Sequence, residues 1–104
     1  MPTEVLVDAG NCGFKTRIRA EARGEEIRFE VASSCEKIRK WAERLGSLKM
    51  LELTLPVNEN PVYRAAGKET QICPPCPVLS GLLMAAWAEA GYMLKKNPSL
   101  TFKG

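Results

Sequence analysis

Four cysteines and the absence of histidine define the chemistry that this chain can support. The 104 residues contain Cys12, Cys35, Cys73 and Cys76. Without histidine, a Ser-His or Cys-His nucleophile pair cannot form, and the commonest zinc ligand is missing. A metal site must therefore rest on cysteine thiolates, with help from a carboxylate or the backbone. We interpret the cysteines as candidate ligands rather than as isolated buried apolar residues.

The cysteines fall at positions where backbone groups favour ligand binding. Cys12 lies in a predicted loop, Ala9-Gly10-Asn11-Cys12-Gly13, whose glycines permit close backbone approach. Ser33-Ser34-Cys35-Glu36 has the form of a capping box, which predicts Cys35 in the first turn of a helix. Cys76 stands at or beside the start of a second helix, with Pro77 at its first position. A helix N-terminus favours thiolate, the form that ligates metal or attacks a disulfide.

The elements that must position these loops follow from hydrophobic periodicity. Period-two alternation predicts strands near residues 5–8, 18–22, 27–31 and 51–55, with a turn at 23–25 between the second and third. Apolar spacing predicts one helix through residues 38–45 and another through 78–90, each ended by a glycine. Residues 100–102 are expected to form a last short strand, and residues 56–71 a long irregular connection.

These elements predict one α+β domain over residues 1–104. We expect a mostly antiparallel sheet of three to four strands, with the two main helices packed on one face. The order of the strands is left open. Trp41 is interpreted as a core anchor, and Ser80, Gly81 and Ala85 would permit close packing of the second helix.

Composition narrows the partners and the compartment. The net charge is +3, and the basic residues are interleaved with acids, so no nucleic-acid partner is expected. The longest nearly apolar stretch, residues 77–87, is too short to span a bilayer, so no membrane association is expected either. The N-terminus has no secretory pattern, which favours a cytoplasmic location where thiols stay reduced. The carboxylates are dispersed, and we do not predict a hydrolase or a nucleotide enzyme.

The order of these segments resembles the IscU/NifU-type family of iron–sulfur cluster scaffolds. The resemblance covers roughly residues 5 to 92 and rests on a Cys-Gly loop, a cysteine between strand and helix, and a cysteine opening a later helix, separated by 23 and 41 residues. It implies an IscU/NifU-like fold, a cluster held by Cys12, Cys35 and Cys76, and a cysteine desulfurase or an apo-acceptor protein as partner. Phe14 stands where that family has an aspartate. The chain also resembles small uncharacterised proteins with Cys-Gly-Phe and Cys-Pro-Val segments.

Three functions remain open from the sequence. The first is a protein, not necessarily an enzyme, that binds zinc or an iron–sulfur cluster through Cys12, Cys35 and Cys76, with Cys73, Asp8 or an exogenous group as fourth ligand. The second is a thiol–disulfide redox protein that uses Cys73-Pro-Pro-Cys76. The third is a non-enzymatic interaction domain with structural thiols. The oligomeric state is also left open.

Overall fold

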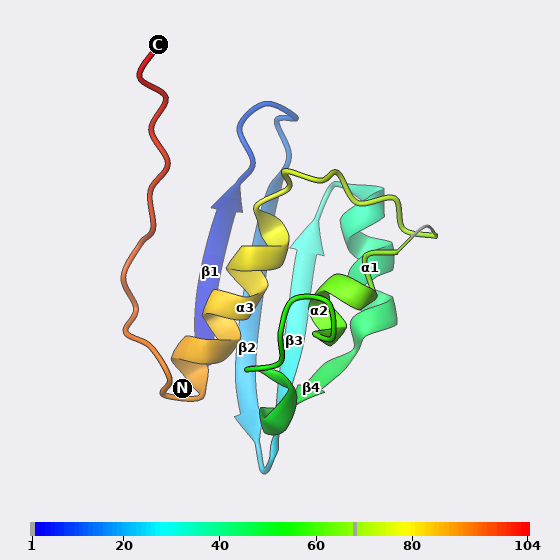
Figure 1. The fold of residues 1–104 in the computed structure, drawn as a ribbon, viewed down its shortest axis with the longest axis vertical. Coiled ribbons are helices and arrows are strands. Elements are labelled where there is room, and N and C mark those ends of the chain that lie inside the picture. Colours follow the sequence, from blue (N-terminus) through cyan, green and yellow to red (C-terminus); the bar gives the residue numbers. More distant parts are fainter. Residues whose placement is uncertain (1, 68) are drawn as a thin grey trace.

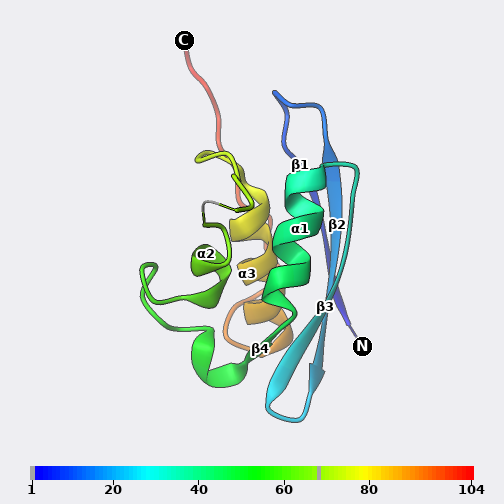
Figure 2. The ribbon, with the colours of Figure 1, turned by 90° about the vertical axis from the view of Figure 1, so that its right-hand side faces the viewer.

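One antiparallel sheet with helices on a single face makes up the domain. The computed structural model describes residues 2–67 and 69–104. The sheet has the strand order β1-β2-β3-β4. Figure 1 shows the sheet and the helices in front of it, and Figure 2 shows that the helices of the described residues all lie on this one face. This confirms the predicted α+β class, with four strands and a third, short helix in addition to the two expected ones.

The first three strands form a meander that the alternation predicted. β1 spans Thr3–Asp8, β2 spans Lys15–Arg23 and β3 spans Glu26–Ser33. β2 and β3 pair in register, with Arg23 opposite Glu26, so that Gly24 and Glu25 form the tight turn. Ile18, Ala20 and Ile27 are fully buried under the helices. Their neighbours in sequence project from the bare face, where arginines and glutamates alternate along the strands.

Helix α1 spans Glu36–Leu45, and its start differs from the predicted capping box. The N-cap is Cys35, which uses no side-chain cap, and the Cys35 carbonyl accepts the first helical hydrogen bond, from Arg39. The Ser33 hydroxyl instead accepts hydrogen bonds from the Cys35 N–H and the Thr16 hydroxyl, which pairs with Ser33 across the sheet. The cross-strand partner therefore draws Ser33 into β3, and the helix begins two residues later than the capping-box pattern predicts.

The predicted strand at residues 51–55 is wrong. The fourth strand, β4, is Ser47–Lys49 and pairs with the start of β3, and the 3-10 turn η1 follows at Met50–Glu52. A hydrogen bond from the Lys49 N–H to the Glu52 carboxylate holds this turn. Leu51 is 86% exposed while Leu53 is 1% exposed, so the leucines do not share one face. Their alternation matched a strand, but β3 has no free partner positions beyond residue 26 for them to pair with.

The segment before the cysteine turn is held by polar side chains that reach its backbone. Helix α2 spans Pro61–Arg64, a short element inside the connection expected to be irregular. Asn60 caps it by accepting from the Val62 N–H and donates through its amide to the carbonyls of Glu52 and Leu55. The indole N–H groups of Trp41 and Trp87 donate to the carbonyls of Val62 and Leu53. Two tryptophans on the main helices thus fix the path of this connection.

Helix α3, Val78–Glu89, packs across β1 and β2. It is apolar nearly all round, as expected for a deeply buried helix. A Cβ at Gly81 would lie 2.6 Å from Val7 Cγ2, so glycine at this position lets α3 approach the sheet, which confirms the prediction for Gly81. At the far end of the helix the Glu89 carboxylate accepts from the Thr3 hydroxyl and the Ala22 N–H.

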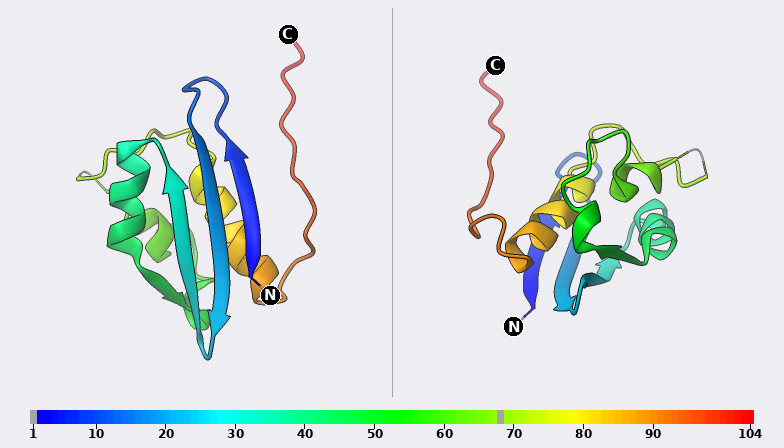
Figure 3. Two further views of the ribbon diagram at one scale, coloured as in Figure 1. Left: turned by 180° about the vertical axis from the view of Figure 1, so that it is seen from behind. Right: turned by 60° about the horizontal axis from the view of Figure 1, so that its bottom comes forward.

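The chain after α3 leaves the domain as an extended tail. Figure 3 shows it from two further sides, running clear of the helices. Every residue from Leu94 to Gly104 is exposed, and the strand predicted at Leu100 and Phe102 is not formed. Across residues 2–67 and 69–104, no helix is both long enough and apolar enough to cross a membrane.

Candidate thiol site

Three separate segments bring the four cysteines to one end of the molecule. Cys12 lies in the β1–β2 loop, Cys35 at the junction of β3 and α1, and Cys73 and Cys76 in the turn that leads into α3. The three segments share the same end in Figure 1 and in the perpendicular view of Figure 2. All four cysteines are free thiols. The fold therefore gathers every residue of this chain that could supply a thiolate.

The Cys12 loop has a defined backbone geometry. The Ala9 N–H donates to the Phe14 carbonyl, and the Gly13 N–H donates to the Gly10 carbonyl. Gly10 and Gly13 have φ values of 76° and 75°, a region that side chains with a Cβ rarely adopt. This backbone presents Cys12 as an exposed thiol at the tip of the loop. The loop is thus built to display its cysteine rather than to bury it.

Asp8, the predicted alternative ligand, lies at the base of the same loop. Its carboxylate accepts a hydrogen bond from the Gly10 N–H at 3.0 Å. This hydrogen bond stabilises the turn that the glycines form. A carboxylate has further lone pairs, so this hydrogen bond leaves the second carboxylate oxygen open to another partner.

Cys35 is half-buried at the start of α1 and is held by its backbone. The hydrogen bond from its N–H to Ser33 and the bond from Arg39 to its carbonyl fix the residue on both sides. Its side chain makes no cap hydrogen bond. The thiol is therefore positioned by the strand–helix junction and carries no structural hydrogen bond of its own within the helix cap.

Cys73 and Cys76 form a tight turn. The Cys76 N–H donates to the Cys73 carbonyl at 3.0 Å across Pro74 and Pro75. A four-residue turn of this kind holds its terminal Cα atoms within about 7 Å, which is also the upper limit for a disulfide. Pro77 has helical dihedral angles of −78° and −5°, and α3 proper begins one residue later, at Val78. Cys73 is exposed and Cys76 is half-buried.

Burial raises the pKa of the Cys76 thiol above its ordinary value of 9.0. The Val78 N–H at the start of α3 opposes this effect by hydrogen bonding to the sulfur. Negative charge on Cys35, Cys73 and Cys12 would raise the pKa of Cys76 further, so each of these three thiols lies within electrostatic range of Cys76. At neutral pH the raised pKa keeps Cys76 a protonated thiol.

The alkylation rates of the four cysteines should differ. We expect iodoacetamide at pH 7.5 to label the exposed Cys12 and Cys73 first and Cys76 last, because the thiolate is the nucleophile and the pKa of Cys76 is raised. The rate of Cys76 labelling should keep rising with pH beyond 9.0, the ordinary value above which the rate of an unshifted thiol levels off. Peptide mass spectrometry at timed intervals measures each rate. In urea-unfolded protein the difference should vanish; preferential early labelling of Cys76 in the folded protein would contradict this assignment.

The four thiols do not form a ready-made metal cage. Within residues 2–67 and 69–104, no three cysteine or acidic side chains are arranged so that they could hold a metal ion. The structure thus places all four predicted ligands at one end of the domain, but it does not direct them at a common metal position. These ligands are Cys12, Cys35, Cys76 and Cys73. Binding through three of them would require the Cys12 loop or the Cys73–Cys76 turn to move toward Cys35.

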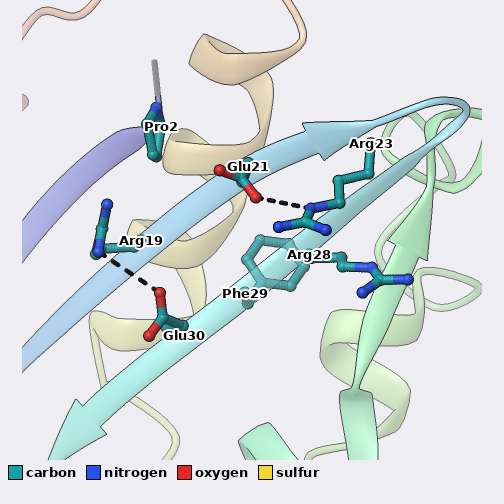
Figure 4. A pocket seen from close by; sticks show the side chains of 7 residues that line it. All are labelled: Pro2, Arg19, Glu21, Arg23, Arg28, Phe29 and Glu30. Carbon is teal, nitrogen blue, oxygen red and sulfur yellow. Dashed lines mark hydrogen bonds and ion pairs between the residues drawn. The ribbon is translucent and has the colours of Figure 1, made fainter.

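A shallow pocket on the bare face of the sheet lies away from the cysteines, toward the β2–β3 turn. It has a volume of about 240 Å³ and is lined by Pro2, Phe29 and charged side chains of β2 and β3. Figure 4 shows that Arg19 pairs with Glu30 and Arg23 with Glu21. Because its charges are largely paired across the pocket, it offers no nucleophile and no cluster of one sign of charge. Sequence reasoning did not predict this pocket, since only the strand register brings its residues together.

The fold and the thiol end define a small α+β domain that displays four free cysteines on three loops. The chain belongs to DUF6951, a family of unknown function whose model matches residues 3–102. No curated protein matches the chain, and neither does any solved structure.

Proposed function

We propose that this protein binds a metal ion or an iron–sulfur cluster through its cysteines. The observation that carries the proposal is the gathering of all four cysteines at one end of the fold from three separate segments. Cysteines that served only as small core residues would be buried at unrelated places, yet two of these are exposed and two half-buried. Four thiolates suit zinc and iron–sulfur centres, which take tetrahedral sulfur ligands.

Cys12, Cys35 and Cys76 are the proposed core of the ligand set. Cys35 is the N-cap of α1, and Cys76 lies two residues before the first residue of α3, so both are close to the ends of packed helices. Cys12 is on the glycine-containing loop and would move toward them on binding. Cys73, three residues before Cys76, or Asp8, or an exogenous group would supply the fourth position. Because ligating thiols must lose their protons, binding would release protons and would be weaker at low pH.

A finer proposal follows from the resemblance in cysteine order. The protein would act as an IscU/NifU-like scaffold or carrier in the cytoplasm, receiving sulfur from a cysteine desulfurase and passing a cluster to an apo-acceptor protein. The cysteine settings support this proposal: a Cys-Gly loop after the first strand, a strand–helix junction, and a turn before the last helix. An open fourth position would suit release of the cluster more than a closed structural site would.

The test is metal and labile-sulfide content of protein purified without oxygen, for the wild type and for Cys12→Ser, Cys35→Ser, Cys76→Ser and Cys73→Ser. We expect near-stoichiometric iron with sulfide, or zinc, in the wild type and its loss in each of the first three variants. Retention of metal in Cys73→Ser together with its loss in Asp8→Asn would assign the fourth ligand to Asp8. Ser34→Ala, beside Cys35, is the matched control and should keep the metal.

Absence of metal from the wild type would contradict the proposal if it persists after anaerobic reconstitution with iron and sulfide and after zinc titration. Circular dichroism spectra of each variant separate loss of ligand from loss of fold. Hydrogen exchange adds a second measurement that does not depend on metal analysis. Binding should protect the backbone amides of residues 9–14 and those of Cys73 and Cys76, since these segments carry the proposed ligands.

A second function is favoured by the turn at Cys73–Cys76. The hydrogen bond across this turn holds the two residues at a separation that a disulfide accepts. The Cys73 and Cys76 thiols would give two electrons and two protons to a disulfide in a substrate protein. That disulfide would be reduced to two thiols, and a Cys73–Cys76 disulfide would form. The raised pKa of Cys76 makes the exposed Cys73 the better attacking thiol. Metal-free protein with a defined Cys73–Cys76 reduction potential would favour this function over metal binding.

A further inference from the structure

The exposed edge of β1 and the exposed C-terminal tail are two unpaired features of the same chain. β1 lies at one end of the strand order, so in residues 2–67 and 69–104 it has β2 as its single strand partner and its other edge is unpaired. The tail has Leu100 and Phe102 each 96% exposed. Proteins commonly cover or break such an edge because it is a template for another strand. The family match extends to residue 102, so the tail is part of the family's domain rather than an addition to it.

We propose that residues 99–104 of one copy add as an antiparallel strand to the β1 edge of a second copy, in a reciprocal two-fold dimer. The tail alternates Ser99, Leu100, Thr101, Phe102 and Lys103, the pattern of a half-buried strand. Strand addition of this kind obtains affinity from backbone hydrogen bonds and specificity from alternate side chains. This inference is independent of the metal or redox function of the thiol end.

The two segments match in length and in side-chain character. β1 has six residues, Thr3–Asp8, and the tail segment 99–104 covers all of them. In the antiparallel register that sets Leu100 beside Val7, Phe102 lies beside Val5. Both valines are only half-buried at the edge of the core, so the two apolar tail side chains would complete the layer between the sheet and α3.

Charge favours the same register on the bare face of the sheet. There Lys103 of one copy lies opposite Glu4 of the other, and Ser99 lies opposite Asp8. Opposite charges directly across a strand pair are favourable, whereas like charges are not. Two β1 strands paired with each other about Leu6 would instead set Glu4 against Asp8. The acidic bare face of β1 thus selects the lysine-bearing tail over a second β1.

The tail of a second copy fits the β1 edge better than the tail of the same chain does. The tail runs in the same direction as the β1 of its own molecule in Figure 1, so closure onto its own edge would make a parallel pair. Parallel pairs are less stable and are found in sheets covered on both faces, and this sheet is bare on one. In the part of the chain that the structure describes, no backbone hydrogen bond joins residues 97–104 to β1. A two-fold related copy can supply the antiparallel strand.

Sedimentation equilibrium of the full chain over a concentration series, under reducing conditions to exclude disulfide-linked dimers, tests this proposal. We expect a reversible monomer–dimer equilibrium in the wild type and a monomer when the chain is truncated after Pro98. Phe102→Asp should weaken dimerisation by about tenfold to a hundredfold through loss of its burial. Leu94→Asp, an exposed leucine outside the paired segment, is the control and should leave the equilibrium unchanged.

A charge exchange tests the register. Lys103→Glu should weaken dimerisation by roughly two- to fivefold, and adding Glu4→Lys should restore it. A wild type that stays monomeric at every concentration overturns the proposal. So does a dimer that persists after truncation, which would place the interface elsewhere. Monomeric protein in which the amides of residues 99–104 are protected from exchange would show closure within one chain and would equally overturn it.

Discussion

Trp41→Ala is expected to lower the free energy of unfolding by about 4–5 kcal/mol. The side chain is fully buried, and its indole N–H donates to the Val62 carbonyl at 2.8 Å. Removing a buried tryptophan costs about 3–5 kcal/mol through lost transfer energy and the remaining cavity, and the unpaired carbonyl adds to it. A domain of this size has a total stability of about 5–15 kcal/mol, so the variant should be close to unfolding. α1, whose N-cap is Cys35, would lose its anchor to the connection before the cysteine turn.

Urea unfolding followed by far-ultraviolet circular dichroism measures this loss without relying on tryptophan fluorescence. Trp41→Phe keeps most of the apolar volume and should lower the free energy of unfolding by about 2 kcal/mol. This loss measures the missing hydrogen bond together with the smaller ring. Trp87→Phe is the matched control, because Trp87 makes the same kind of bond to Leu53 but is half-buried; we expect about 1 kcal/mol. A loss below about 2 kcal/mol for Trp41→Ala would contradict its assignment as the core anchor.

Gly81→Val is expected to destabilise the domain by about 3 kcal/mol. The added Cβ would lie 2.6 Å from Val7 Cγ2, a distance at which one of the two elements has to shift. Overpacking of this kind costs about 1–3 kcal/mol and sometimes more, and Val7 is β-branched and cannot turn aside freely. Displacing α3 from β1 would also displace Cys76, which lies just before the first turn of that helix. Metal binding or disulfide formation at the thiol end should therefore weaken together with stability.

Gly81→Ala separates two opposing effects. Alanine gains about 1 kcal/mol of helix propensity over glycine, but its Cβ meets the same valine methyl. We expect a net loss of about 1 kcal/mol, and the double variant with Val7→Ala should show a favourable coupling of similar size. Ser80→Ala, exposed on the same helix, should change stability by less than about 0.5 kcal/mol. Additive losses in the double variant would mean that the contact does not limit the approach of the helix.

Hydrophobic periodicity in the sequence predicted the strands and helices that bury one regular face. The β2–β3 hairpin is one case, since its alternation and glycine turn leave little choice of register. The two main helices are another, because their apolar spacing and terminal glycines are local signals. The same signals misplaced the fourth strand, where Leu51, Leu53 and Leu55 alternate but pair with nothing. Strand pairing is a long-range property, and β3 offers its free edge only to residues 47–49.

The properties of the candidate site also divide into those that the sequence determines and those that depend on the tertiary structure. The sequence by itself determined that the chain has four cysteines and no histidine, and its local patterns placed Cys12 in a loop and Cys35 and Cys76 beside two helix starts. Only the tertiary structure decided that these places lie at one end of the domain, because strand order and helix direction set which loops are neighbours. It also decided that Cys12 and Cys73 are exposed and that the pKa of Cys76 is raised, because burial depends on contacts between segments distant in sequence.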